Sequence, residues 1–143
     1  MLTPFSLFTS IFRRKPRAEP ARPLPEGMMR LHLFGGIFGS EAAARDYLFG
    51  PVEVDLIDAP APMTVDLPDA FVNADFVRMS WGIGKEALLA EYFRGEALMD
   101  AVHITSPFDT LALLPEEGLG GVPFRLHDTP KLRYLGAFLV TAP

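Results

Sequence analysis

The 143-residue sequence contains no cysteine and only three histidines. The missing cysteine excludes a disulfide scaffold, a cysteine nucleophile and every thiolate metal site. The histidines show no H-x-x-x-H or H-E-x-x-H spacing, so no zinc site is predicted. No apolar run reaches the roughly 18 to 20 residues that span a bilayer. We therefore expect no metal, no cofactor and no membrane span. The three histidines are His32, His103 and His127.

Recognisable catalytic motifs are also missing. None of the five serines stands in a G-x-S-x-G elbow, and no pair of carboxylates indicates general acid and base roles. The glycines of residues 35–39 and 82–85 depart from both common phosphate-binding patterns and are more typical of tight turns. The sequence therefore predicts a protein that is not an enzyme. A catalytic alternative would need a concave pocket that holds one of the histidines beside a carboxylate.

What the chain does have is an uneven distribution of charge. Its 13 Lys and Arg against 18 Asp and Glu give a formal net charge of −5, and 49% hydrophobic residues suffice for one core. Between Glu41 and Glu117 fifteen acids face four bases, whereas residues 1–27 carry five bases and two acids. An acidic surface repels nucleic acid and attracts a basic protein. The alternative is a general acidic excess that keeps the chain soluble.

Residues 1–27 form a segment of their own, followed by a single domain over residues 28–143. Apolar residues recur at three- and four-residue spacing from Leu2 to Phe12, which is typical of an amphipathic helix. A basic cluster and four prolines within ten residues follow, which indicates an extended tail or linker. A secretory signal has its basic residues before the apolar stretch, not after it. We therefore expect the protein in the cytoplasm or at the inner face of the membrane.

Three interpretations of the amphipathic segment stay open. Its apolar face inserts into a membrane interface while the basic cluster contacts anionic lipid, or it docks on the domain or on a partner. In the third, translation starts at Met28 or Met29 and the segment is absent from the protein. The residues that would contact a membrane are Phe5, Phe8, Phe12, Arg13, Arg14 and Lys15.

The periodicity of the domain predicts an α+β fold with a mixed, largely antiparallel sheet and helices packed on one face. Ser40 is expected to cap a helix over residues 41–49. Helical patterns also cover residues 85–94 and 96–103, with Gly95 dividing or weakening them. Gly136 predicts a bulge or a close backbone approach within the last strand. Strands are expected over residues 30–34, 52–56, 64–67, 76–81, 109–114, 122–126 and 132–140.

Several short motifs resemble the immunity protein 22 family of bacterial polymorphic-toxin systems. They are LHLFGGIF at residues 31–38 with the Ser-Glu and Tyr-Leu pairs that follow, the Asp-Phe-Val step at residues 75–77, and KLRYLGAF at residues 131–138. The resemblance implies a small intracellular protein that binds a toxin and blocks it without chemistry of its own. The chain departs from the family in its N-terminal extension, in Phe34 where tryptophan is usual nearby, and in the proline-rich residues 58–68.

Charge and resemblance together predict a non-enzymatic binding protein, an immunity-type inhibitor whose acidic loops contact a basic partner such as a toxin. Trp81 is either an aromatic anchor for that partner or a core residue. The alternative function is a peripheral membrane adaptor anchored by residues 2–12. The predicted partner-binding residues are Asp58, Asp66, Asp69, Asp75 and Trp81.

Overall fold

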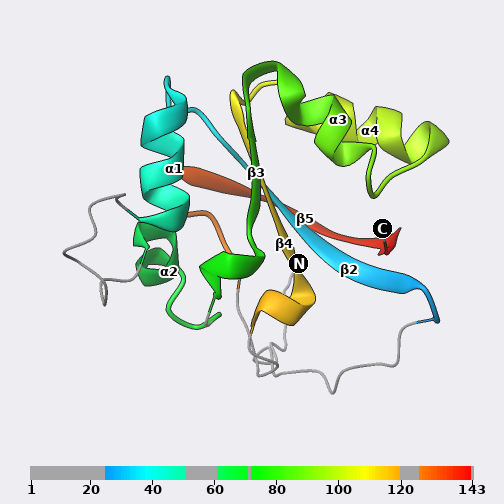
Figure 1. Cartoon of the computed structure of the whole chain (residues 1–143), viewed down its shortest axis with the longest axis horizontal. Coiled ribbons are helices and arrows are strands. Elements are labelled where there is room, and N and C mark those ends of the chain that lie inside the picture. The colour runs from blue at the N-terminus through cyan, green and yellow to red at the C-terminus, as the bar shows by residue number, and fades with distance from the viewer. Residues whose placement is uncertain (1–24, 51–60, 71, 120–125, 143) are drawn as a thin grey trace, which may run out of the picture.

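The computed structural model describes residues 25–50, 61–70, 72–119 and 126–142, and its centre is a four-stranded antiparallel sheet (Figure 1). The strand order is β3-β4-β2-β5, so β3 and β5 are the edges. The predicted α+β class and largely antiparallel pairing are confirmed; all three described strand pairings are antiparallel, so the described sheet is not mixed. The strands are β2 (Met28–Gly36), β3 (Arg78–Trp81), β4 (Thr110–Pro115) and β5 (Leu132–Thr141).

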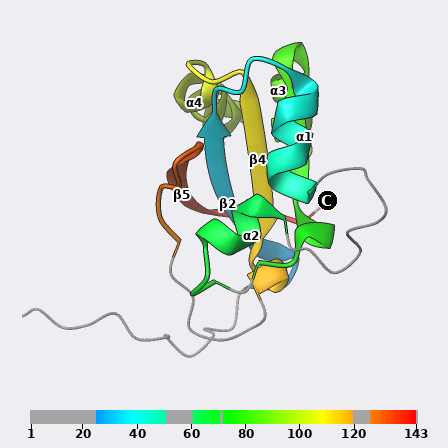
Figure 2. The same cartoon turned by 90° about the vertical axis from the view of Figure 1, so that its left-hand side faces the viewer.

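Within the described ranges, four α-helices and three short 3₁₀ helices lie in the connections between these strands (Figures 1 and 2). None of the described helices is long and apolar enough to cross a membrane. The α-helices are α1 (Glu41–Phe49), α2 (Pro62–Asp66), α3 (Lys85–Leu89) and α4 (Gly95–Thr105). The 3₁₀ helices are η2 (Ala74–Phe76), η3 (Gly82–Gly84) and η4 (Glu116–Leu119).

The sheet has a hydrophobic cluster on each face, which corrects the prediction that all helices pack on one side. Leu31 and Leu33 of β2 point towards α3 and α4, whereas Phe34 of the same strand packs with α1 and α2. Every residue of β4 is buried. A central strand that buries both of its faces has a nearly continuous apolar sequence, and LALLP at residues 111–115 is such a sequence. The two helix pairs thus cover opposite faces (Figure 1).

The start of α1 is fixed by two side chains. As predicted, Ser40 is the N-cap, and its Oγ accepts a hydrogen bond from the Ala43 N–H at 3.1 Å. The Asp109 carboxylate at the start of β4 accepts from the Phe38 and Gly39 N–H groups at 2.9 and 2.8 Å. Burial opposes ionisation of Asp109, but these backbone donors outweigh it and lower the pKa of the carboxyl. The loop between β2 and α1 is therefore held to the sheet.

The predicted irregularity at Gly136 is present. The pairing of β2 with β5 passes from Leu33 opposite Gly136 to Phe34 opposite Tyr134, which leaves Leu135 as an extra residue. Gly136 has a φ of 122°, a conformation that a side chain would strain. The bulge divides β5 into a short regular segment, residues 132–134, and a longer one, residues 136–141.

Other expected elements have a different type or different bounds in the structure, or lie outside the described residues. The predicted strand at residues 64–67 is wrong, because residues 62–66 form α2 with Pro62 in its first turn, where a missing N–H costs nothing. The helical pattern from residue 85 ends at Leu89, and α4 begins at Gly95, so this glycine divides the two helices. The predicted strand at residues 52–56 lies outside the described residues, as does most of residues 122–126.

Candidate functional site

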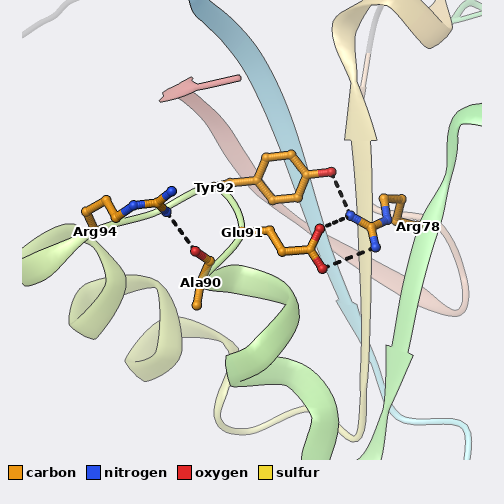
Figure 3. A network of polar contacts seen from close by, with 5 residues as sticks. All are labelled: Arg78, Ala90, Glu91, Tyr92 and Arg94. Carbon is orange, nitrogen blue, oxygen red and sulfur yellow. Dashed lines mark hydrogen bonds and ion pairs between the residues drawn. The ribbon is translucent and has the colours of Figure 1, made fainter. Parts of the chain in front are cut away.

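All four basic side chains between Glu41 and Glu117 are bound within the fold. Arg45 pairs with Glu41 one helical turn away, at 3.1 Å. Arg78 of β3 donates from both terminal nitrogens to the carboxylate of Glu91, beyond the end of α3 (Figure 3). This pairing raises the pKa of Arg78 and lowers the pKa of Glu91. Each of these two bases therefore neutralises a single neighbouring acid.

The other two bases bind backbone carbonyl groups and form no ion pair with a described acid, although Lys85 is near enough to Asp109 to help lower the pKa of that carboxyl. Lys85 Nζ donates to the Thr105 carbonyl oxygen at 2.9 Å and to that of Phe108, which fixes the connection between α4 and β4. Arg94 donates to the Ala90 carbonyl oxygen at 2.7 Å, in the connection between α3 and α4 (Figure 3). The acidic excess of this part of the sequence is consequently left to the surface.

Part of that excess gathers where η2 lies against η4. The Asn73 N–H donates to the Gly118 carbonyl oxygen at 2.8 Å, so the exposed Asp75 and Glu117 stand on neighbouring elements. Asp69 is exposed in the turn that follows α2. None of these three acids has an ion-pair partner within the described part of the chain. We call these three exposed acids the acidic corner; Asp75 and Glu117 lie on elements in contact, and Asp69 precedes η2 by five residues in the chain.

An aromatic side chain stands at the acidic corner. A Cβ atom placed on Gly118 would lie 2.7 Å from Cβ of Phe76, so this side chain packs directly on the glycine. Phe76 nevertheless keeps 38% of its surface exposed. The Asn73 side chain accepts from the Asp75 N–H at 2.9 Å and caps η2, which turns the chain before β3 begins. A half-exposed phenyl ring that follows Asp75 in the chain and packs on the glycine after Glu117 is a suitable anchor for a protein interface.

The structure brings together only some of the predicted partner-binding residues. Asp69 and Asp75 are exposed, as a contact surface requires, and Asp58 lies outside the described residues. Asp66 is partly buried and accepts from the Tyr47 hydroxyl at 2.6 Å, so it ties α1 to α2. Trp81 is 37% exposed and is the last residue of β3, at the end of the strand away from η2. It therefore belongs neither to the described core clusters nor to the acidic corner.

Phe76 and Glu117 were missed by the sequence interpretation. Phe76 was expected as one of the alternating residues of a strand over 76–81, which would not distinguish it from a core side chain. The Asn73-x-Asp75 spacing indicates a local turn that would have removed Phe76 from the strand. Glu117 carries no comparable signal, because its position beside Asp75 depends on a contact between distant segments.

A second polar cluster connects β2, η4 and β5. His32 is 1% exposed, with its Nδ1 atom 2.9 Å from the Tyr134 hydroxyl and its Nε2 atom 3.4 Å from Oε1 of Glu116. Arg30 donates to the other oxygen of Glu116 at 2.8 Å. This is the pairing of histidine and carboxylate that a catalytic alternative requires. An imidazole buried to this degree presents almost no surface to a substrate, so the cluster ties these elements together.

The remaining predicted site residues are not described. The candidate membrane contacts Phe5, Phe8, Phe12, Arg13, Arg14 and Lys15 all lie outside the described residues. The other two histidines, His103 and His127, are exposed. Within the described ranges, no three histidine or carboxylate side chains gather closely enough to hold a metal ion.

Comparison with known proteins gives no relative from which a role could be transferred. The chain matches no protein-family model, no curated protein and no solved structure. The resemblance to the immunity protein 22 family therefore stays a prediction from the short motifs.

Proposed function

We propose that the chain is a non-enzymatic binding protein, an immunity-type inhibitor that neutralises a bacterial toxin by docking a basic surface of it. The acidic corner is the contact surface in this proposal. Phe76 supplies an apolar anchor on the elements that carry Asp75 and Glu117, and the carboxylates steer the partner into place.

One observation carries the proposal. The four bases between Glu41 and Glu117 are all bound within the fold, and Lys85 and Arg94 donate to carbonyl groups and form no ion pair with a described acid. A solubilising surface needs no such arrangement, since mixed charges keep a protein soluble as well. Exposed carboxylates without counter-charges keep their field, and such a field raises the association rate with a basic protein.

The experiment uses the protein that the neighbouring gene encodes. The motifs resemble an immunity protein family of polymorphic-toxin systems, and in such systems a toxin and its inhibitor are produced together. That neighbour is expressed in a bacterial host with and without the full chain, and growth is followed. The proposal expects growth arrest by the neighbour alone and recovery when the chain is present. Co-purification of the two proteins then shows direct contact.

A matched pair of variants connects recovery with the acidic corner. The first combines Asp69→Asn, Asp75→Asn and Glu117→Gln. The second combines Glu86→Gln, Glu96→Gln and Asp100→Asn, which removes the same charge from exposed positions in α3 and α4. Recovery should be lost with the first set and kept with the second. A neighbour that neither arrests growth nor binds the chain contradicts the inhibitor proposal.

A further inference from the structure

The outer edge of β5 carries backbone groups that the described sheet does not use. The Ala142 N–H donates to the Gly27 carbonyl oxygen at 2.8 Å, so this residue faces β2. Because N–H and C=O directions alternate along an antiparallel strand, Val140 and Phe138 face β2 as well. The backbone groups of Ala137, Leu139 and Thr141 therefore point outward. Among the described residues no strand pairs with this side of β5.

Residues 136–141 of this edge lack the features that usually prevent two sheets from joining. Natural edge strands are protected by charges, prolines, bulges or short length. β3, at the other edge, has four residues. β5 has ten, and after its bulge the sequence GAFLVT contains no charged residue and no proline. Leu139 within it is 52% exposed, and its neighbours on the same face, Ala137 and Thr141, are exposed too.

We propose that β5 pairs with β5 of a second copy of this chain, antiparallel and about a two-fold axis at Leu139. In that register Leu139 lies opposite Leu139 of the other copy, and Ala137 lies opposite Thr141. All three are residues whose N–H and C=O groups point outward, so each opposing pair exchanges two hydrogen bonds. The two sheets become one continuous eight-stranded sheet with its two β3 strands at the edges.

Two properties of the edge favour a second copy over a strand from another protein. The outward groups are symmetric about Leu139, and a two-fold interface requires a surface that is complementary to itself. The paired segment is uncharged although the chain has a net charge of −5, so no like charges face each other across the axis. Within β5 the nearest base, Arg133, lies six positions from Leu139, which separates its two copies by about 40 Å along the strands. Arg30, which lies opposite Leu139 on β2, is paired with Glu116.

The absence of cysteine makes a direct test possible. In the full chain carrying Leu139→Cys, the two thiols face each other across the axis, with Cα atoms about 5.5 Å apart, within the range that a disulfide bridges. Met99→Cys is the matched control, since Met99 is 71% exposed on α4. Under mild oxidation the Leu139→Cys chain should cross-link at least about tenfold faster, because pairing gives its thiols a high effective concentration. Equal rates for the two variants would overturn the proposal.

Light scattering during size-exclusion chromatography gives the second measurement. The unaltered full chain should have twice its mass of 15.8 kDa. Leu139→Lys places a charge on each side of the axis and should give a monomer, whereas Met99→Lys should remain a dimer. Circular dichroism establishes that both variants are folded. A monomeric unaltered chain, or a dimer that Leu139→Lys leaves intact, contradicts pairing through β5. If Leu139→Lys does not fold, the cross-linking rates of the two cysteine variants decide between pairing and no pairing.

Discussion

The Nε2 atom of His32 lies 3.4 Å from Oε1 of Glu116, in a part of the fold where the imidazole is almost completely buried. Burial lowers the pKa of His32 because it disfavours the charged ring, and the Glu116 carboxylate counteracts this only in part. The histidine in this cluster therefore prefers its neutral form when the protein is folded.

This preference predicts a loss of stability in mild acid. The unfolded chain binds a proton near the ordinary histidine pKa of 6.5, whereas the folded chain binds it at lower pH. The free energy of unfolding should therefore fall as the pH is lowered through about 6.5. Urea unfolding at several pH values should show a smaller decrease for His32→Gln than for the unaltered protein. A stability that rises as the pH falls through this range, or an identical slope for the variant, would contradict the assignment.

The hydroxyl of Tyr47 predicts a second effect on stability. It donates to Asp66 at 2.6 Å and lies 2.7 Å from Oγ1 of Thr129, and this buried site raises the pKa of Tyr47. Tyr47→Phe should lower the free energy of unfolding by about 1 to 3 kcal/mol, because a bond to a charged group is lost in a partly buried site. Tyr92→Phe is the control. It removes a hydroxyl 3.1 Å from Arg78, which keeps its pairing with Glu91, so it should cost less than about 1 kcal/mol. Equal costs in chemical unfolding would be inconsistent with this difference.

The two half-exposed aromatic residues should differ in their effect on partner binding. Phe76→Ala removes the exposed ring beside Asp75 and should weaken binding by about 2 kcal/mol, or roughly thirtyfold. Trp81 lies at the other end of β3, so Trp81→Ala should change the affinity for the partner by no more than a factor of about three. Isothermal titration with the neighbouring gene product measures both. A larger loss with Trp81→Ala would move the interface to the opposite end of the sheet.

Features that depend on adjacent residues could be predicted from the sequence. The helix after Ser40 follows from its cap and three alanines, and the irregularity at Gly136 follows from a glycine within an alternating strand. The side of the sheet on which each helix lies could not be predicted, because it depends on pairing between distant strands. The contiguous apolar residues LALLP did indicate burial on both faces, but they were interpreted as alternation.

In the candidate site, too, only features that depend on adjacent residues could be predicted from the sequence. Exposed aspartates were expected from the charge distribution, and Asp69 and Asp75 are exposed. The proximity of Asp75 to Glu117 depends on the Asn73–Gly118 hydrogen bond, which joins segments far apart in the chain. The pairing of His32 with Glu116 is equally non-local. Periodicity within one segment contains no information about such contacts.

The salt dependence of the affinity for the neighbouring gene product tests the account most directly. Titrations at about 50 and 300 mM salt should show a clear loss of affinity for the unaltered chain, since salt screens exposed charges. The variant with Asp69→Asn, Asp75→Asn and Glu117→Gln should bind at least about tenfold more weakly at low salt and depend less on salt. The variant with Glu86→Gln, Glu96→Gln and Asp100→Asn should behave like the unaltered chain. Tight binding that neither salt nor the first set of substitutions weakens would contradict an interface at the acidic corner.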